Sequence, residues 1–235
     1  MRKYVLALAI SVCAMITVQA QDKEKPKIEG SGNVVTKEVT VSSFDQLNVQ
    51  GVFSVLLTQG NKEEVKIEAD DNLQQLFEVK NEGSTLTISM KKDMNFNSKK
   101  KMKVYVTFKK LKSMELKTVG NVSSDQTMNF DDLKISNKSV GSVDLKMTAQ
   151  KLDVDNKSVG NVKLNGKAEN AVIKNKGVGS LQAADFLVQT MDIENTGVGS
   201  AEVNAIKALT VKDSFLGKVT NKGAATVKKL NTTKI

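Results

Sequence analysis

The side chains that most often carry enzyme chemistry are scarce in this chain of 235 residues. It has no His and no Trp, its one Cys is Cys13, and its one Arg is Arg2. Carboxylates are the remaining candidates, as Asp70-Asp71, Asp131-Asp132 and the pair Asp153/Asp155. Paired carboxylates hydrolyse glycosidic bonds, and acidic clusters hold Ca²⁺ in enzymes that cleave acidic polysaccharides. A polysaccharide-active enzyme is therefore the catalytic hypothesis to weigh.

The surroundings of these acids favour structural roles. Asp70-Asp71 precedes Leu73, a position typical of a helix N-cap. Asp153 and Asp155 alternate with apolar residues, which directs them to solvent on a strand. Sugar-binding clefts need aromatic platforms, and Phe186 is the one aromatic residue between positions 133 and 211. The sequence predicts no catalytic residue, no cofactor and no metal site.

Lysines form two groups that suit an anionic partner. The segment 91–103 is the densest basic stretch and includes Lys99, Lys100, Lys101 and Lys103. Such a run is ordinarily a solvated loop, and its functional reading is contact with acidic glycans or envelope components. The second group recurs along the chain as Lys138, Lys157 and Lys176. Because stacked like charges repel, these three must turn into water or meet an anion.

Nucleic acid is not an expected partner. Readout of base edges uses Arg, and binding of single strands uses aromatic stacking, whereas this chain has one Arg and is 4% aromatic. Its formal net charge of +9 comes almost entirely from Lys.

The N-terminus has the pattern of a secretory signal peptide. Arg2 and Lys3 precede an apolar run, and Val18-Gln19-Ala20 forms a cleavage site. We expect residues 1–20 to be the signal, residues 21–30 a polar leader, and no transmembrane segment to remain after cleavage. Removal of Arg2 and Lys3 leaves 33 Lys against 26 acidic residues, a net charge of about +7. The protein is expected to be exported to the periplasm, the outer surface or the medium.

An internal repeat of about 19 residues organises residues 112–235. One glycine marks each unit and follows an aliphatic residue, at Gly120, Gly141, Gly160, Gly179, Gly199 and Gly217. Upstream of it, apolar and polar residues alternate as in half-buried strands. Units this short fit one coil of a parallel β-helix, in which each coil covers the next at the strand spacing of about 4.8 Å. A β-sandwich would not keep column identity. The sequence therefore predicts an all-β solenoid.

One column of the repeat is polar. Asn137, Asn156, Asn175 and Asn195 stand four residues before the glycines. We interpret them as a structural ladder at a coil corner, where stacked amides bond to one another and tolerate sharp turns. The glycine column is likewise interpreted as structural, because Gly in a strand edge marks a bend.

Residues 31–111 are β-rich but lack a period. Strands are expected at 39–41, 53–57, 65–68, 86–90 and 104–108, with turns at 59–62, 70–72 and 81–84. We expect this part to form irregular opening coils or a cap of the same solenoid, because the first unit must close an open core and edge.

The chain resembles the putative adhesin family with a head GIN domain, found in Bacteroides-like bacteria. The likeness is carried by Phe44–Val55, Thr58-Gln59-Gly60, Val65–Leu73, Leu86-Thr87-Ile88 and the later strands punctuated by glycine. It departs from the family at Gly51-Val52-Phe53, where Gly-Ile-Asn is expected, and in its Val-Gly-Ser and Val-Gly-Asn corners. The resemblance implies an exported, solenoid-like β protein with an adhesive or surface role.

Two functions stay open on the sequence. The first is a non-catalytic adhesion or binding module for anionic extracellular partners. The second is a structural component of the envelope that forms homo-oligomers through its coil ends. A polysaccharide-active β-helix enzyme is the third and weakest reading.

Overall fold

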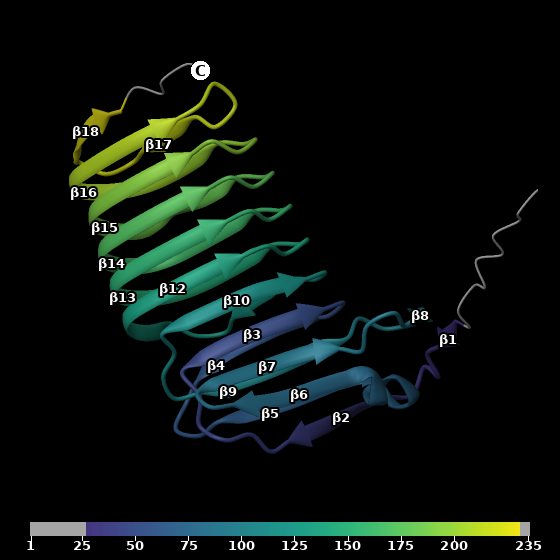
Figure 1. The fold of residues 1–235 in the computed structure, drawn as a ribbon. Helices are drawn as coiled ribbons and strands as arrows, with labels where there is room; N and C mark the ends of the chain where they lie inside the picture. The colour runs from purple at the N-terminus through teal and green to yellow at the C-terminus, as the bar shows by residue number, and fades with distance from the viewer. Residues whose placement is uncertain (1–26, 231–235) are drawn as a thin grey trace, which may run out of the picture.

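The computed structural model describes residues 27–230, which wind into a β-solenoid of about six turns (Figure 1). The all-β solenoid expected from the repeat is confirmed. The signal peptide expected at residues 1–20 lies outside the described residues. No helix in the described part is long and apolar enough to cross a membrane.

One 3₁₀ helix, η1 (Asp71–Leu76), accompanies the strands of the described region. The strands, in chain order, are β1 (Ile28–Glu29), β2 (Val34–Val39), β3 (Gln46–Gly51), β4 (Ser54–Gln59), β5 (Glu64–Asp70), β6 (Phe77–Glu82), β7 (Thr85–Met90), β8 (Phe96–Asn97), β9 (Lys103–Phe108), β10 (Ser113–Thr118), β11 (Val122–Ser124), β12 (Met128–Asn137), β13 (Val143–Asn156), β14 (Val162–Asn175), β15 (Leu181–Asn195), β16 (Ala201–Asp213), β17 (Val219–Asn221) and β18 (Thr226–Lys229).

The repeat coils stack in parallel and largely in register from β12 to β16. Ile135 lies beside Val154, which in turn lies beside Ile173. The pairing continues to Ile193 and Val211. Each coil therefore places the same kind of side chain over the one before it, and the column identity seen in the sequence becomes contact in space.

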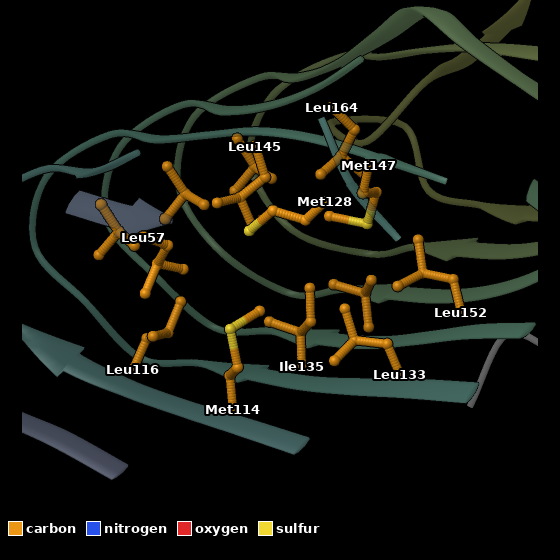
Figure 2. Packing of buried hydrophobic residues seen from close by; sticks show 14 of the residues in the cluster. Leu57, Met114, Leu116, Met128, Leu133, Ile135, Leu145, Met147, Leu152 and Leu164 are labelled. Carbon is orange, nitrogen blue, oxygen red and sulfur yellow. The ribbon is translucent and has the colours of Figure 1, made fainter. Parts of the chain in front are cut away.

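Inward and outward side chains alternate along each strand of the repeat, so each strand is buried on one side and exposed on the other. In β13 the inward residues from Val143 to Val154 are apolar, and the alternation slips once, at the outward pair Gln150-Lys151. Two successive outward residues turn the chain from one face of the coil to the next. The same slip recurs in β14 at Glu169-Asn170. Figure 2 shows the Leu, Ile and Met side chains of several coils meeting in the narrow interior that results.

The glycines allow the coils to approach each other at one edge. Gly141, Gly160, Gly179 and Gly199 have positive φ, between 127° and 135°. A Cβ on any of them would strike the carbonyl oxygen of the glycine one coil earlier. Gly217 keeps the register but not the geometry, because its Cβ would meet the carbonyl of Asn195 and its φ is not in this range.

The four asparagines form a buried ladder just inside this glycine edge. Asn137 donates from Nδ2 to Oδ1 of Asn156 at 2.8 Å, Asn156 donates to Asn175 at 2.7 Å, and Asn175 donates to Asn195 at 2.7 Å. Asn195 ends the ladder by donating to the carbonyl of Gly217 at 2.8 Å. All four side chains are buried. An amide fits this column because it donates upward and accepts from below in every coil.

The N-terminal part closes the solenoid in an order that differs from the chain order. The coil formed by β3 and β4 lies between the coil of β7 and β9 and that of β10 and β11, all in parallel. Beyond the coil of β7 and β9 the pairing is antiparallel. β6 pairs with β7, β5 pairs with β9, and β2 pairs with β5. The first coil to be synthesised is thus enclosed, and antiparallel strands cover the open end of the core (Figure 1).

Three strands of this region, β3, β6 and the two-residue β8, were not predicted from the sequence. In addition, β2 begins five residues before the predicted strand at 39–41. The expected turns at 59–62 and 81–84 are present, since β4 ends at Gln59 and β6 ends at Glu82. β3 was missed because its partners β7 and β10 come from distant segments, so no column pattern marks it. β6 pairs with the adjacent β7 but has no fully buried residue, so its apolar alternation is weak.

The glycine edge gives a test of the stacking. Gly160→Ala is expected to lower the stability of the protein by at least about 1–3 kcal/mol, because the positive φ is strained for Ala and the added Cβ meets backbone. Gly83→Asn is the control, since Gly83 has a φ of 59° and no atom within 4 Å of its Cβ position. Thermal and denaturant unfolding would measure both. Equal effects of the two changes would contradict the close approach of the coils.

The ladder gives a second test. Asn156→Ala leaves the buried Asn137 amide and the Asn175 oxygen without partners, and we expect a loss of about 2–4 kcal/mol. Asn170→Ala, at an exposed site in the same region, is expected to change stability by less than about 0.5 kcal/mol. Denaturant unfolding of the two variants decides the matter. A loss below 1 kcal/mol for Asn156→Ala would mean that the ladder only fills space.

Candidate functional site

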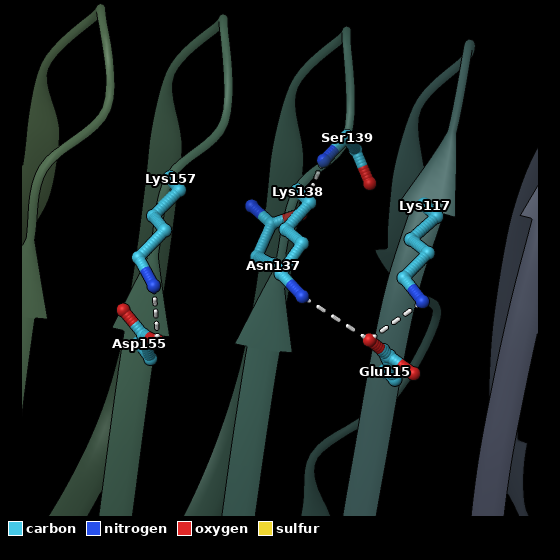
Figure 3. A network of polar contacts seen from close by, with 7 residues as sticks. All are labelled: Glu115, Lys117, Asn137, Lys138, Ser139, Asp155 and Lys157. Carbon is cyan, nitrogen blue, oxygen red and sulfur yellow. Dashed lines mark hydrogen bonds and ion pairs between the residues drawn. The ribbon is translucent and has the colours of Figure 1, made fainter.

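The recurring lysines lie on one face of the solenoid, close to the glycine turns (Figure 3). Lys117 and Lys138 both reach Oε1 of Glu115, at 2.8 and 3.4 Å. Lys157 pairs with Asp155 at 3.0 Å. In Figure 3 the lysine side chains run from the turns back along the strands toward these carboxylates.

Further along the same face, Lys176 and Lys212 both contact Glu194, at 3.8 and 3.4 Å. Lys138, Lys157 and Lys176 keep 46–48% of their side-chain surface exposed, and the anions that they meet in the structure are carboxylates of the chain itself. Carboxylates placed two residues before the lysine, or in the neighbouring coil, balance the column. The electrostatics agree, because hydrogen bonds from Lys117 and then Lys138 hold the pKa of Glu115 below its ordinary value. The column therefore offers little free positive charge.

The lysines of the loop between β7 and β9 differ. Lys99, Lys100 and Lys101 are exposed, and within residues 27–230 they form no ion pair. This loop takes the place of the short glycine turn that links the two faces in other coils, and it lies at the N-terminal end of the glycine edge. We call Lys99–Lys101 the basic loop. Lys91 and Lys92, at the start of the predicted basic stretch, are likewise exposed without an ion pair inside residues 27–230, whereas Lys103 is paired.

A buried carboxylate holds the basic loop in place. Asp70 is fully buried, and its two oxygens accept from the Gly32 N–H at 2.8 Å and from the Ser98 hydroxyl at 2.7 Å. The neighbouring Met102 is also buried. The loop is thus anchored on both sides of its three lysines, which lowers the conformational entropy lost on binding.

The role expected for Asp70 was therefore wrong in its chemistry. Asp70 does stand at the N-cap of η1, but its side chain makes no capping hydrogen bond. Asp71 instead contacts Ser31 and Asn33 and accepts from the Asn72 N–H. No signal in the sequence marks this burial, because Asp70 directly follows the inward Ala69 and strand alternation would turn its side chain outward.

Lys103, the fourth lysine of the predicted set, is occupied. Its ammonium lies 2.9 Å from Oε1 of Glu68, and the Tyr105 hydroxyl donates to the other oxygen at 2.7 Å. The hydrogen bond from Lys103, followed by that from Tyr105, lowers the pKa of Glu68 from its ordinary value of 4.5. The same pair raises the pKa of Lys103.

A groove of about 1,370 Å³ lies at the coil corners opposite the glycine edge. Its rim carries both signs of charge, and the pairs Lys112–Asp45 at 2.7 Å and Lys109–Glu63 at 2.9 Å neutralise part of it. The candidate acids Asp131, Asp132 and Asp153 border this groove, but Asp155 does not. In the strand register Asp132 stands beside Lys151 and Asp153 beside Lys134. The structure thus sets carboxylates among lysines.

Within 27–230 no group of three or more His, Cys, Asp or Glu side chains is arranged to hold a metal ion.

Comparison with known proteins places this geometry in a family. The family model described as "putative auto-transporter adhesin, head GIN domain" matches residues 43–225. The chain belongs to this family. A comparison with curated proteins found no match.

Solved structures similar to this chain come from Bacteroides and Parabacteroides species. A putative adhesin from Bacteroides fragilis is 30% identical to this head GIN protein, with a TM-score of 0.76 over 86% of this chain and 100% of that one. A putative adhesin from Parabacteroides merdae is 20% identical, with a TM-score of 0.54 over 87% and 99%. A protein from Parabacteroides distasonis described as a putative lipid binding protein is 17% identical, with a TM-score of 0.60 over 88% and 100%. The last two show the shared fold.

The Glu68 site predicts a pH dependence. Because the pKa of Glu68 is lower in the folded protein, its contribution to stability is fully present above about pH 4.5 and is lost as the pH falls through the folded pKa. Glu68→Gln is expected to reduce stability by about 0.5–1 kcal/mol at pH 7 and by less at pH 3. Glu169→Gln, at an exposed carboxylate, serves as the control. Unfolding curves for Glu68→Gln and wild type that stay separated by the same amount at both pH values would disprove this pairing.

Proposed function

We propose that this head GIN protein is an exported, non-catalytic adhesion module that holds acidic glycans of the extracellular space through the basic loop. The observation that carries the proposal is the contrast between two sets of lysines. The periodic column is neutralised by carboxylates, whereas Lys99, Lys100 and Lys101 are exposed without ion pairs in the described part of the chain. Membership in a family of adhesins supports a surface binding role.

Export supports the choice of partner. The N-terminal pattern of residues 1–20 is that of a secretory signal, with cleavage proposed after Ala20. Polyanions outside the cell are chiefly glycans and lipid head groups. Three clustered ammonium groups on an anchored loop suit a repeating carboxylate or sulfate, because each exposed pair contributes a modest energy and several act together.

In this proposed role the protein catalyses no reaction. The carboxylates near the groove are interleaved with lysines, and Asp155 is engaged by Lys157. Aromatic platforms that would hold a sugar ring for cleavage are missing from the repeat coils 133–211 apart from the buried Phe186. Binding without turnover is the behaviour that this surface supports.

The test compares two triple variants with the same loss of charge. Lys99→Gln/Lys100→Gln/Lys101→Gln is expected to weaken binding to heparin or polygalacturonate about tenfold at low salt, because three exposed attractions of up to about 1 kcal/mol each are removed. Lys138→Gln/Lys157→Gln/Lys176→Gln is expected to bind nearly as wild type. Titration at 20 and 150 mM salt would measure both, and the wild-type affinity should fall with salt.

Equal weakening by the two triple variants would show that net charge alone attracts the glycan, and the basic loop would lose its assignment. Assay of the same mixtures for new reducing ends or unsaturated sugars tests the non-catalytic part separately. Product formation by the wild type would overturn it.

A further inference from the structure

A line of exposed aliphatic side chains follows the glycine edge of the solenoid. Each coil except that of β7 and β9 contributes one member, and the members are Val52, Val119, Val140, Val159, Val178, Val198 and Leu216. We call this line the valine ridge. Its members are between 46% and 61% exposed, and parallel bridges join the five central valines in sequence. Phe215, beside Leu216, is 98% exposed. Packing of the core does not account for these residues, because their side chains face solvent.

The five central valines of the ridge, Val119 to Val198, form a strip that carries no charge. Each of them is followed by glycine and then by Asn or Ser, as in Val140-Gly141-Ser142 and Val159-Gly160-Asn161. At the C-terminal end, the exposed Lys218 follows Leu216-Gly217. The polar tips bond within the protein, because Oδ1 of Asn121 accepts from the Ser142 N–H at 3.1 Å. The lysines two residues before the valines lean away from the tips and pair with carboxylates (Figure 3).

The size of the strip matches a protein interface. Seven half-exposed aliphatic residues and one fully exposed Phe present on the order of 800 Å² of apolar surface, more than the few hundred Å² usual for a patch on a monomer. About 800 Å² is also what each partner buries in a stable interface of standard size.

We propose that the valine ridge of one copy of this chain packs on the glycine column beside the ridge of a second copy, with the two solenoids side by side and parallel. Beside the raised valines runs the glycine column, which carries no side chains. If the two-fold axis lies along the solenoid, the ridge of each copy faces the glycine strip of the other. Both strips repeat with the same rise, so every coil finds an equivalent coil opposite. An antiparallel pairing would set ridge against ridge.

Charge also favours a second copy over a lipid surface. A helix or edge that lies in a membrane interface presents Trp or Tyr together with free Lys or Arg. The five central tips have neither, and their neighbouring lysines are withdrawn. For a protein with a formal net charge of +9, an uncharged strip is where two copies approach with the least repulsion.

Parallel pairing also bears on glycan binding by the basic loop. Only this step of the inference rests on the proposed function. Both basic loops would lie at the same end of the dimer. Two loops on one polyanion turn the second contact into an intramolecular one, so the apparent affinity rises without new contacts.

The experiment uses the full chain, expressed with its own N-terminal segment and purified as the cell processes it. Light scattering and sedimentation from 1 to 100 μM are expected to show a dimer. Val159→Glu, in the middle of the ridge, should raise the dimer dissociation constant at least tenfold. Leu187→Glu, a similarly exposed position at 43% on another face of the coil, should leave it unchanged. Unfolding curves for both variants confirm that each is folded.

A monomer at 100 μM, or equal dissociation by the two variants, would overturn the proposal. A monomer that floats with phosphatidylglycerol vesicles in a way abolished by Val159→Glu would assign the ridge to lipid instead. Glycan binding by the monomeric Val159→Glu variant separates this inference from the proposed function, since a single basic loop should still bind, more weakly.

Orientation is tested by disulfide trapping in chains that carry Cys13→Ser. Two chains that both carry Val119→Cys should form a cross-linked dimer. Two chains that both carry Val198→Cys should do the same. In a mixture of the two variants, cross-links between Val119→Cys and Val198→Cys chains are not expected, because the two positions lie at different heights. Such mixed cross-links would show antiparallel packing and overturn the parallel arrangement.

Discussion

In-register stacking of parallel coils is the constraint on which the structure depends. At a strand spacing of about 4.8 Å every side chain in the repeat lies against its counterparts in the coils above and below. A column of similar residues is therefore stable only if such side chains can pack or hydrogen-bond with one another. Aliphatic residues such as Ile135 and Val154 pack together. Asn137 and Asn156 hydrogen-bond because an amide both donates and accepts. At the edge, glycine is required because the carbonyl of the preceding coil occupies the space of a Cβ.

The same constraint governs the outer surface. A column of lysines at this spacing is unfavourable, and the chain relieves it with Glu115, Asp155 and Glu194 on the adjacent positions. Periodicity therefore tends to remove free charge from the regular part of the solenoid. Unbalanced charge persists where the period breaks, in the long loop before β9. An apolar column meets no such penalty, which explains how an exposed row of valines extends along the glycine edge.

Features that repeat could be predicted from the sequence, and features made by distant pairing could not. The glycine, asparagine and aliphatic columns show in the spacing alone, and the structure aligns them with the exception of Gly217. By contrast, the position of β3 between β7 and β10 leaves no periodic trace, because each contact is made once. The partners of Lys138 were missed for a related reason. Glu115 is 23 residues away, and its place in the neighbouring coil is known only once the register is.

Asp70 shows how the irregular end obtains its order. A fully buried carboxylate is costly unless hydrogen bonds replace its hydration, and here the Gly32 N–H and the Ser98 hydroxyl supply them. Both come from segments outside the repeat, which would otherwise have little to fix them. The carboxylate thus links the segment before β2 to the loop that carries Lys99–Lys101. The stacked coils set the shape of the scaffold, and this single buried group fixes a charged loop that lies outside the stacked coils.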